Sequence, residues 1–192
     1  MKNILHNKIY ISDIKRVIER FDLHYLNGRS VLVTGGLGLI CSSVVDLLVM
    51  HNECHNADVK IYIAARNKQL FEERYGVYPY IKYINYDATK PINFDFRVDY
   101  IIHGAGVASP ELYVAKPVET MLSNFNGVLN LLKYAKNNNV RRMLYISSSE
   151  VYGSKITEDS FEESQFGSID INSIRSSYSE SKRASEVLCK AY

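Results

Sequence analysis

Short apolar runs alternate with longer stretches of helical spacing along most of the chain. After Asn27-Gly28, five runs rich in β-branched and aromatic residues predict strands: SVLVT, VKIYIAA, YIKYINY, VDYIIHG and RRMLYIS. Their nearly continuous apolar character is typical of strands that are covered on both faces of a parallel sheet. The pattern therefore predicts an α/β fold with a doubly wound parallel sheet.

The spacing of apolar residues also predicts the helices between these strands. Three helices are expected from Leu39 to Met50, from Pro117 to Asn137 and from Ser177 to Tyr192. A leading amphipathic helix is expected from Ser12 to about Phe21, with Ser12 or Asp13 as the cap at its start.

Composition and charge narrow the class of protein. Of the 192 residues, 46% are hydrophobic and 23% are charged, as in an ordinary globular domain. The net charge is only +2 and no dense basic run occurs, so we expect no nucleic-acid partner. The stretch from Ser30 to Met50 carries Asp46 and several polar residues, and the N-terminus lacks a continuous apolar segment. We therefore expect a cytoplasmic protein without membrane contact.

The cysteines do not indicate a disulfide framework or a zinc module. Cys41, Cys54 and Cys189 are odd in number and irregularly spaced, so reduced thiols are expected. His51, Cys54 and His55 are close in sequence, but no fourth ligand lies near them. We interpret this segment as a polar helix end and expect no metal site.

A glycine-rich turn, TGGLGLIC, begins where the first predicted strand ends. Between a strand and an apolar helix, such glycines let the backbone approach a pyrophosphate at the helix N-terminus, although a plain tight turn is the alternative. The candidate cofactor-binding residues in it are Gly35, Gly36, Leu37, Gly38, Leu39 and Ile40. From the leading helix and the strand-helix pattern after it, we expect two parts: an N-terminal helical extension, 1–28, and a dinucleotide-binding domain, 29–192.

The turn resembles TGGxGxIG of the extended short-chain dehydrogenase/reductases, which implies a Rossmann-like fold. Cys41 replaces the last glycine and requires extra room there. The segment AARN after the second strand holds no carboxylate for a ribose hydroxyl. Arg66 in it is suited to clamp the 2′-phosphate of NADP or to stack on adenine, and a solvated loop arginine is the alternative. By the same resemblance Asp87 meets the adenine amino group; a strand-end cap is its alternative.

A tyrosine and a lysine in YSESK point to redox chemistry. Tyr178 and Lys182 share one helix face, and a nearby ammonium stabilises the phenolate that a tyrosine base requires, although an exposed helix pair is the alternative. The resemblance implies that Ser148, in ISSSEVYG, hydrogen-bonds the reacting sugar oxygen. It also implies cofactor roles for Ala105, Asn124, Tyr178 and Lys182, of which Lys182 holds the ribose. A buried asparagine at a helix bend is the alternative for Asn124.

Two longer stretches are similar to UDP-glucuronate decarboxylases (UDP-xylose synthases). They are HGAGVASPELYVAKPVETMLSNFNGVLNLL and RSSYSESKRASEVL. The resemblance implies that Ser109, Tyr113 and Ser149 contact the substrate. In the related 4,6-dehydratases an Asp-Glu pair follows the catalytic hydroxyl residue, because expelling a C6 hydroxyl requires a proton donor. Ser149 stands in place of the aspartate and is a poor donor, whereas loss of carbon dioxide needs no such donor. Glu150 is expected to act as a base or to orient water, unless backbone amides satisfy it as a strand-end carboxylate.

The resemblance implies an internal redox cycle on a UDP-sugar: oxidation at C4, loss of carbon dioxide and re-reduction. NAD fits this cycle because the hydride is returned, and NADP is the alternative that Arg66 suggests. A 4-epimerase or a 4,6-dehydratase is the rival enzyme, and a non-catalytic dinucleotide-binding fragment or scaffold is the rival of another class. A homodimer is expected for the full-length protein.

In this family another strand and a C-terminal substrate region follow the Tyr-x-x-x-Lys helix, whereas this chain ends at Tyr192. The domain is therefore expected to be truncated before that region. An uncovered strand edge invites self-association, and a missing lid leaves the substrate unclamped. We expect the isolated chain to bind cofactor weakly at most and to show no measurable decarboxylation.

Overall fold

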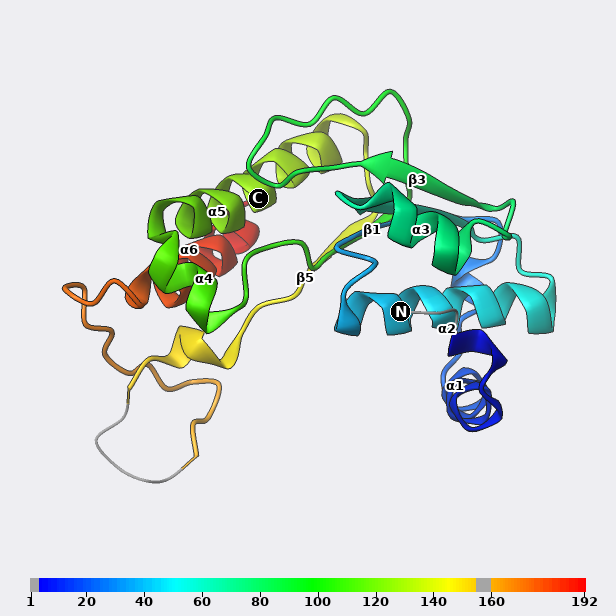
Figure 1. Ribbon diagram of the computed structural model, residues 1–192, viewed down its shortest axis with the longest axis horizontal. Helices are drawn as coiled ribbons and strands as arrows, with labels where there is room; N and C mark the ends of the chain where they lie inside the picture. Colours follow the sequence, from blue (N-terminus) through cyan, green and yellow to red (C-terminus); the bar gives the residue numbers. More distant parts are fainter. Residues whose placement is uncertain (1–3, 155–159) are drawn as a thin grey trace. The chain divides into compact units, whose positions relative to one another are not determined.

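The computed structural model describes residues 4–154 and 160–192. Its elements, traced in Figure 1, are η1 (Ile4–His6), α1 (Lys8–Arg20), η2 (His24–Leu26), β1 (Ser30–Thr34), α2 (Leu39–His55), β2 (Lys60–Ala65), α3 (Lys68–Tyr75), β3 (Ile81–Asn85), β4 (Tyr100–His103), α4 (Pro110–Ala115), α5 (Pro117–Asn137), β5 (Arg142–Tyr145), η3 (Ser149–Tyr152) and α6 (Ser176–Ala191). Elements marked η are short 3₁₀ turns.

The strands form one sheet in the order β3-β2-β1-β4-β5. The pairings of β1 with β2 and β4, and of β2 with β3, are parallel. The chain runs outward from β1 through β2 to β3 and then returns to place β4 on the other side of β1. This order confirms the doubly wound Rossmann-like fold, and the reversal beside β1 is where such sheets bind ligands at their carboxyl ends.

The central strands are apolar because the fold covers both of their faces. Val31, Leu32 and Val33 of β1 point to alternate faces of the sheet, and all three side chains are at most 2% exposed. A strand buried on one face would alternate apolar and polar residues. The near-continuous apolar runs therefore correspond to the five observed strands, each within two residues of its predicted bounds.

Helix α1 begins earlier than the sequence pattern predicts. The side chain of Asn7 accepts hydrogen bonds from the amides of Ile9 and Tyr10, so Asn7 caps the helix. Ser12 and Asp13, the expected caps, lie inside α1, and that prediction was wrong. The carboxamide of Asn7 stands ahead of them and satisfies the first amides of the helix.

The bounds of the other helices agree only in part with those predicted from sequence. Helix α5 has the predicted bounds and α6 is shifted by one residue. Helix α2 runs past Met50 to His55 and ends at Asn56, whose φ of 48° is left-handed. Helices α3 and α4 were not predicted; α4 starts with Pro110 at a first-turn position, where a missing amide costs nothing.

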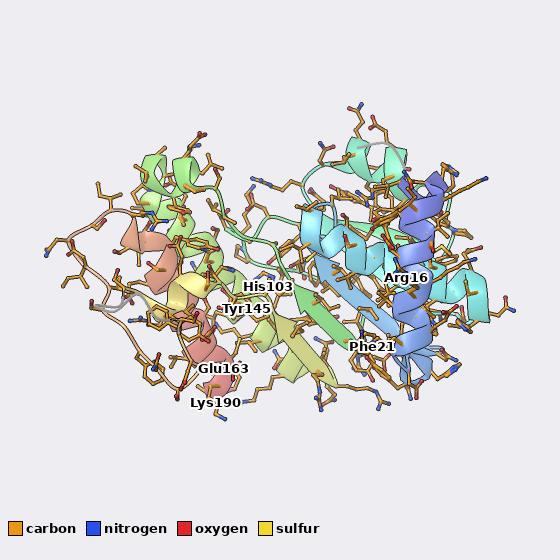
Figure 2. All side chains as sticks on the ribbon, turned by 90° about the horizontal axis from the view of Figure 1, so that it is seen from below. Arg16, Phe21, His103, Tyr145, Glu163 and Lys190 are labelled. Carbon is orange, nitrogen blue, oxygen red and sulfur yellow. The ribbon has the colours of Figure 1, made fainter. Side chains whose placement is uncertain are left out.

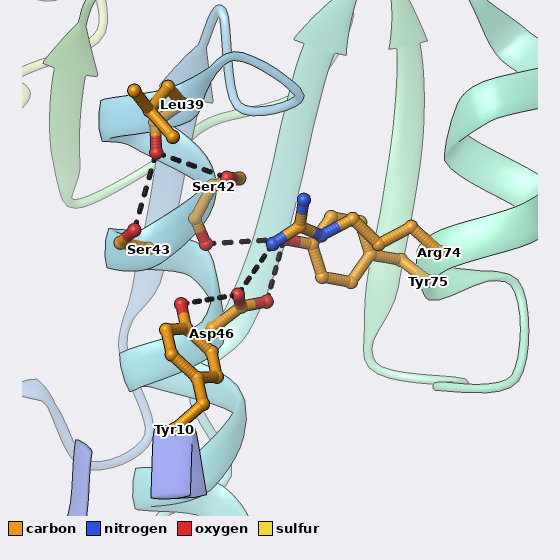
Figure 3. A network of polar contacts seen from close by, with 7 residues as sticks. All are labelled: Tyr10, Leu39, Ser42, Ser43, Asp46, Arg74 and Tyr75. Atoms are coloured by element: carbon orange, nitrogen blue, oxygen red, sulfur yellow. Dashed lines mark hydrogen bonds and ion pairs between the residues drawn. The ribbon is translucent and has the colours of Figure 1, made fainter. Parts of the chain in front are cut away.

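A buried carboxylate on α2 joins three helices of the N-terminal half (Figure 3). Asp46 is fully buried and forms an ion pair of 2.6 Å with Arg74 of α3. The hydroxyls of Tyr75 and Tyr10 each donate to Asp46 at 2.8 Å, from α3 and α1 respectively. Burial, more than the charge of Asp46, raises the pKa of the Tyr75 phenol, so that it stays a donor. The helix that follows the glycine turn is thus fixed to α1 and α3.

The chain divides into two compact units. The first comprises Met1–Asp87, Asn93–Gly104 and Ala135–Leu144, and the second comprises Ala88–Ile92, Ala105–Tyr134 and Tyr145–Tyr192. The glycine turn belongs to the first unit, whereas α4, α6 and most of α5 belong to the second. Among the described residues, no helix is both long enough and apolar enough to cross a membrane.

Candidate active site

The glycine turn of the first unit connects β1 to α2. Gly35 has a φ of 69°, a conformation that residues with a Cβ rarely adopt. A Cβ on Gly36 would lie 3.1 Å from Cγ2 of Ile63. Gly38 is the N-cap of α2 and supplies no side chain to its first turn, so the amides at the helix start are left for an anion. These features fit the pyrophosphate of a dinucleotide.

The side chains around the turn point in different directions. Leu39 and Ile40 are 78% and 64% exposed, whereas Leu37 is 9% exposed. We expected Cys41 to require extra room, because it replaces a glycine of the family's turn. Its side chain is 3% exposed and lies in the core. The packed interior of this unit accommodates the thiol where related turns have glycine.

Two further candidate cofactor residues follow neighbouring strands of the same unit. Arg66 comes directly after β2 and is exposed, and Asp87 follows β3 and is partly buried. Since β1, β2 and β3 are parallel neighbours, their carboxyl ends lie along one edge of the sheet. The structure thus brings Arg66 and Asp87 to the edge at which the glycine turn begins.

The end of β4 adds a buried polar contact at this edge. His103, labelled in Figure 2, is the last residue of β4, and its Nδ1 lies 2.6 Å from Oγ1 of Thr34 at the end of β1. Both side chains are fully buried. The pair fixes the two strand ends between which the sheet order reverses. This contact could not be predicted from sequence, since the two residues are 69 positions apart.

The second unit holds the tyrosine and lysine of α6. Tyr178 and Lys182 are each 7% exposed, so the alternative of an exposed helix pair is wrong. Nζ of Lys182 donates to the carbonyl of Ile146 at 2.8 Å and lies 5.9 Å from the centre of the Tyr178 ring. The arrangement suits a tyrosine that gives and takes a proton.

The segment that follows β5 carries Ser148 close in sequence to Ile146, whose carbonyl accepts the hydrogen bond from Lys182. Ser148 comes two residues after Ile146 and caps η3, where its Oγ accepts a hydrogen bond from the amide of Glu150 at 3.2 Å. Ser148 and Glu150 are partly buried, and Ser149 is exposed. A hydroxyl and a carboxylate therefore stand at the carboxyl end of β5, in the same unit as Tyr178.

Tyr113, from the ASPxxY segment, lies against the candidate base. It is 2% exposed, and its ring is stacked on that of Tyr178 with 4.8 Å between centroids. Its hydroxyl donates to Oε1 of Glu150 at 3.4 Å. Ser109 is the N-cap of α4, the helix that carries Tyr113. The structure thus brings Tyr113, Tyr178 and Glu150 together.

Sequence reasoning missed Arg175. It precedes Tyr178 by three residues, and its Nη2 forms a 2.8 Å ion pair with Oε1 of Glu150. Because of this contact Glu150 is paired with a side chain, whereas the alternative interpretation had backbone amides satisfying it. The available signal was an arginine one helical turn before the candidate base, within a stretch already singled out by resemblance.

Asn124 of α5 packs against α6 in the same unit. It is 1% exposed, and its Nδ2 donates to Oγ of Ser181, the residue before Lys182, at 3.1 Å. A Cβ at Gly106, next to Ala105, would lie 2.4 Å from Oδ1 of Asn124. Ala105 itself is partly buried after β4. Glycine at 106 therefore allows the close approach of the loop to the asparagine.

A polar cavity of about 270 Å³ adjoins Glu150 and Arg175. Its remaining lining residues come from the loop after η3 and from the start of α6: Gly153, Ser154, Ser168, Ile169, Asp170, Ser173, Ser176 and Ser179. Hydroxyls and charged groups dominate this lining, which suits a ligand rich in hydroxyl groups.

The histidine and cysteine cluster of α2 makes other contacts. Nε2 of His51 lies 2.9 Å from Oδ1 of Asn27, and the rings of His51 and His55 are 5.2 Å apart. In residues 4–154 and 160–192 no group of three or more metal-ligating side chains could hold an ion. All three cysteines are free thiols.

Comparison with known proteins places the chain among enzymes of similar sequence and fold. It is 38% identical to UDP-glucuronic acid decarboxylase 6 of Arabidopsis thaliana over 168 residues, which is 88% of this chain and 47% of that protein. The solved dTDP-glucose 4,6-dehydratase of Streptomyces venezuelae, with NAD and TYD bound, matches with a TM-score of 0.69 and 26% identity over 85% of this chain and 51% of that one.

A third similar protein is an epimerase. The UDP-N-acetylglucosamine 4-epimerase of Methanobrevibacter ruminantium, in complex with UDP-N-acetylmuramic acid, matches with a TM-score of 0.67 and 28% identity over 85% of this chain and 50% of that one. The chain thus spans about half the length of these relatives. Residues 31–192 match the family described as NAD dependent epimerase/dehydratase. Because the match extends over most of the sequence, the chain belongs to the NAD dependent epimerase/dehydratase family.

Proposed function

We propose that the chain forms the cofactor-binding and catalytic part of a nucleotide-sugar enzyme, and that its reaction is the decarboxylation of UDP-glucuronate. The observation that carries the proposal is the buried pair on α6: the ammonium of Lys182 lies 5.9 Å from the ring of Tyr178 and is held by the carbonyl of Ile146, two residues before Ser148.

Each residue of this group has a role in oxidation at C4. The phenolate of Tyr178 takes the proton of the C4 hydroxyl, and Lys182 stabilises that phenolate. Ser148 donates a hydrogen bond to the same sugar oxygen. A bound nicotinamide would supply the redox chemistry at C4, as acceptor and later donor of one hydride. Tyr178 then returns its proton, so the enzyme ends as it began.

Ser149 supports decarboxylation over dehydration. Loss of a C6 hydroxyl needs a proton donor beside the sugar, and an exposed serine with an ordinary hydroxyl is a poor one. A 4-keto acid loses carbon dioxide without such help, since the C4 carbonyl accepts the electron pair, and the enolate that forms then takes a proton at C5 from water. The similarity to a UDP-glucuronic acid decarboxylase supports the same choice. Glu150 then serves as a base or orients water, while Ser109, Tyr113 and Ser149 contact the sugar.

The glycine turn of the first unit fits the cofactor's pyrophosphate, and NAD is the proposed cofactor because the cycle returns its hydride. Its other proposed contacts are Arg66, Asp87, Ala105, Asn124, Tyr178 and Lys182. Binding of NADP through Arg66 is the alternative. A homodimer of the full-length protein is also part of this proposal, and sedimentation would report it.

The decisive experiment incubates the full-length protein and NAD with UDP-glucuronate, separates the products by chromatography, which resolves epimers of equal mass, and identifies them by mass spectrometry. We expect a UDP-pentose and one carbon dioxide per sugar consumed. UDP-glucose and dTDP-glucose are supplied in parallel, because a 4-epimerase would convert the first and a 4,6-dehydratase the second. Turnover of either of these, with UDP-glucuronate unchanged, would contradict decarboxylation and leave the C4 oxidation standing.

A further inference from the structure

Arg175 contacts two segments outside its own helix. Nη2 forms a 2.8 Å ion pair with Oε1 of Glu150 on η3. Its Cζ lies 5.7 Å from the ring centre of Tyr113 on α4, and Nη2 is 3.5 Å from the hydroxyl of that tyrosine. A guanidinium over an aromatic face is attracted by the ring's electrons. One side chain therefore joins α4, η3 and the start of α6.

The residue that Arg175 holds contacts Ser148 through its backbone and Tyr113 through its carboxylate. The amide of Glu150 donates to Oγ of Ser148 at 3.2 Å. Oε1 of Glu150 also accepts the long, 3.4 Å hydrogen bond from Tyr113, whose ring is stacked on Tyr178. The position of the Glu150 carboxylate is thus defined by two donors, of which Arg175 is the closer and the charged one.

The exposure of this ion pair argues for a role in orientation. The side chains of Arg175 and Glu150 are 58% and 27% exposed, and ion pairs of that kind add little to folding stability. The planar guanidinium, however, fixes the direction of a carboxylate better than a flexible ammonium does. An effect of Arg175 is therefore expected on turnover and not on unfolding.

We propose that Arg175 is a positioning residue for the reaction. It acts through Glu150: the ring of Tyr113 supports the guanidinium, and the guanidinium holds the carboxylate against the hydroxyl of Tyr113, whose ring is stacked on Tyr178, in the geometry that turnover requires. The inference rests on the proposed function, because Glu150 has a part in the reaction only if the sugar is processed at Tyr178.

The test compares Arg175→Met, Arg175→Lys, Glu150→Gln and the double variant Arg175→Met/Glu150→Gln in the full-length protein. We expect Arg175→Met to lower kcat for UDP-glucuronate about 10- to 100-fold, the scale of a misplaced catalytic group, with the NAD affinity and the Tm unchanged. Arg175→Lys keeps the charge and should recover part of kcat. In the Glu150→Gln background, Arg175→Met should add less than about a 2-fold loss, because the two residues act as a unit.

Arg16→Met is the matched control, since Arg16 forms an exposed ion pair with Asp13 on α1 of the first unit. Its kcat should equal that of the wild type. If the wild type decarboxylates UDP-glucuronate and the Arg175→Met variant is equally active, the role of Arg175 is overturned and the proposed function stands. Losses that multiply in the double variant would overturn action through Glu150. A wild type that turns over no nucleotide sugar would overturn the proposed function and this inference with it.

Discussion

The ring of Tyr113 lies nearly parallel to the ring of Tyr178, with 4.8 Å between their centroids and 15° between their planes. The two phenols have different surroundings. Burial, and after it the charge of Glu150, raises the pKa of Tyr113, so that this phenol stays protonated. Lys182 stands beside Tyr178. Tyr113 is thus a neutral surface that holds the ring of Tyr178, and Tyr178 is the candidate base.

Truncation of Tyr113 should therefore lower both stability and turnover. Tyr113→Ala removes a buried ring and should reduce the free energy of unfolding by about 3–5 kcal/mol, and kcat should fall in the protein that remains folded. Tyr113→Phe keeps the stack and loses only the two long hydrogen bonds of the hydroxyl, with Glu150 and Arg175, at about 1 kcal/mol each or less. Urea unfolding and initial rates measure both effects. A folded Tyr113→Ala protein with normal kcat would contradict the positioning of Tyr178.

Tyr178→Phe should abolish turnover while cofactor binding persists. It deletes one hydroxyl and keeps the ring on Tyr113, so the loss is chemical, and removal of an essential proton donor or acceptor lowers rates about 100- to 10,000-fold. Calorimetry with NAD should give the wild-type affinity. Tyr25→Phe, at a tyrosine 61% exposed in the first unit, is the control and should keep full activity. Near-normal turnover of the Tyr178 variant would refute the assignment.

Cofactor preference can be determined at Arg66. We expect the full-length protein to bind NAD more tightly than NADP. Arg66→Ala should weaken NADP binding further and change the NAD affinity by less than about 3-fold, because only NADP carries a 2′-phosphate for the guanidinium. Titration calorimetry with both dinucleotides gives the ratio. Tighter binding of NADP that Arg66→Ala abolishes would reverse the choice of cofactor.

Asp46→Asn should destabilise the protein by about 3–5 kcal/mol. The variant leaves the guanidinium of Arg74, 4% exposed, without its counter-charge in the interior. Urea unfolding of the wild type and the variant measures the difference. Asp13→Asn removes the exposed ion pair with Arg16 and should change stability by about 1 kcal/mol at most. Equal effects of the two substitutions would show that burial of the pair is irrelevant.

Stability should fall as the pH drops below about 6.5 because of His51. Burial, and then the charges of His55 and His24, lower the pKa of His51, against an opposing effect of Asp22. Since the folded pKa lies below the unfolded one, the unfolded chain takes up the proton first and gains from acidification. Urea midpoints at about pH 7.5 and 5.5 should differ more in the wild type than in His51→Gln. His6→Gln, at an exposed histidine, should keep the wild-type difference.

The strands could be predicted because their evidence is local. A strand covered on both faces is apolar in its own residues, and β1 occupies the five residues of SVLVT, Ser30–Thr34. Helix α5 shows its apolar stripe over many turns, and its bounds, Pro117–Asn137, are also those predicted. The start of α1 was missed because two later residues, Ser12 and Asp13, are equally good caps in sequence.

The features that could not be predicted depend on distant partners. Helix α3 has a polar sequence, and Arg74 is buried in it only because Asp46, 28 positions earlier, is buried opposite. Arg175 is an ordinary surface arginine until the fold brings Glu150 and Tyr113 to it, from 25 and 62 positions away. One sequence carries the residue types of such contacts but not their pairing.

The hydroxyl of Tyr10 reaches Asp46 from α1, which precedes the family's matched segment, residues 31–192. The side of α1 that faces the interior should therefore accept fewer substitutions among relatives than its exposed side. Ile14 and Ile18, with Tyr10, face the interior and should accept few replacements, whereas Ile9 is 76% exposed and should vary freely. Close relatives that differ at Tyr10 should also differ at Asp46 or Arg74, so the leading helix is expected to have changed in step with the helix behind the glycine turn.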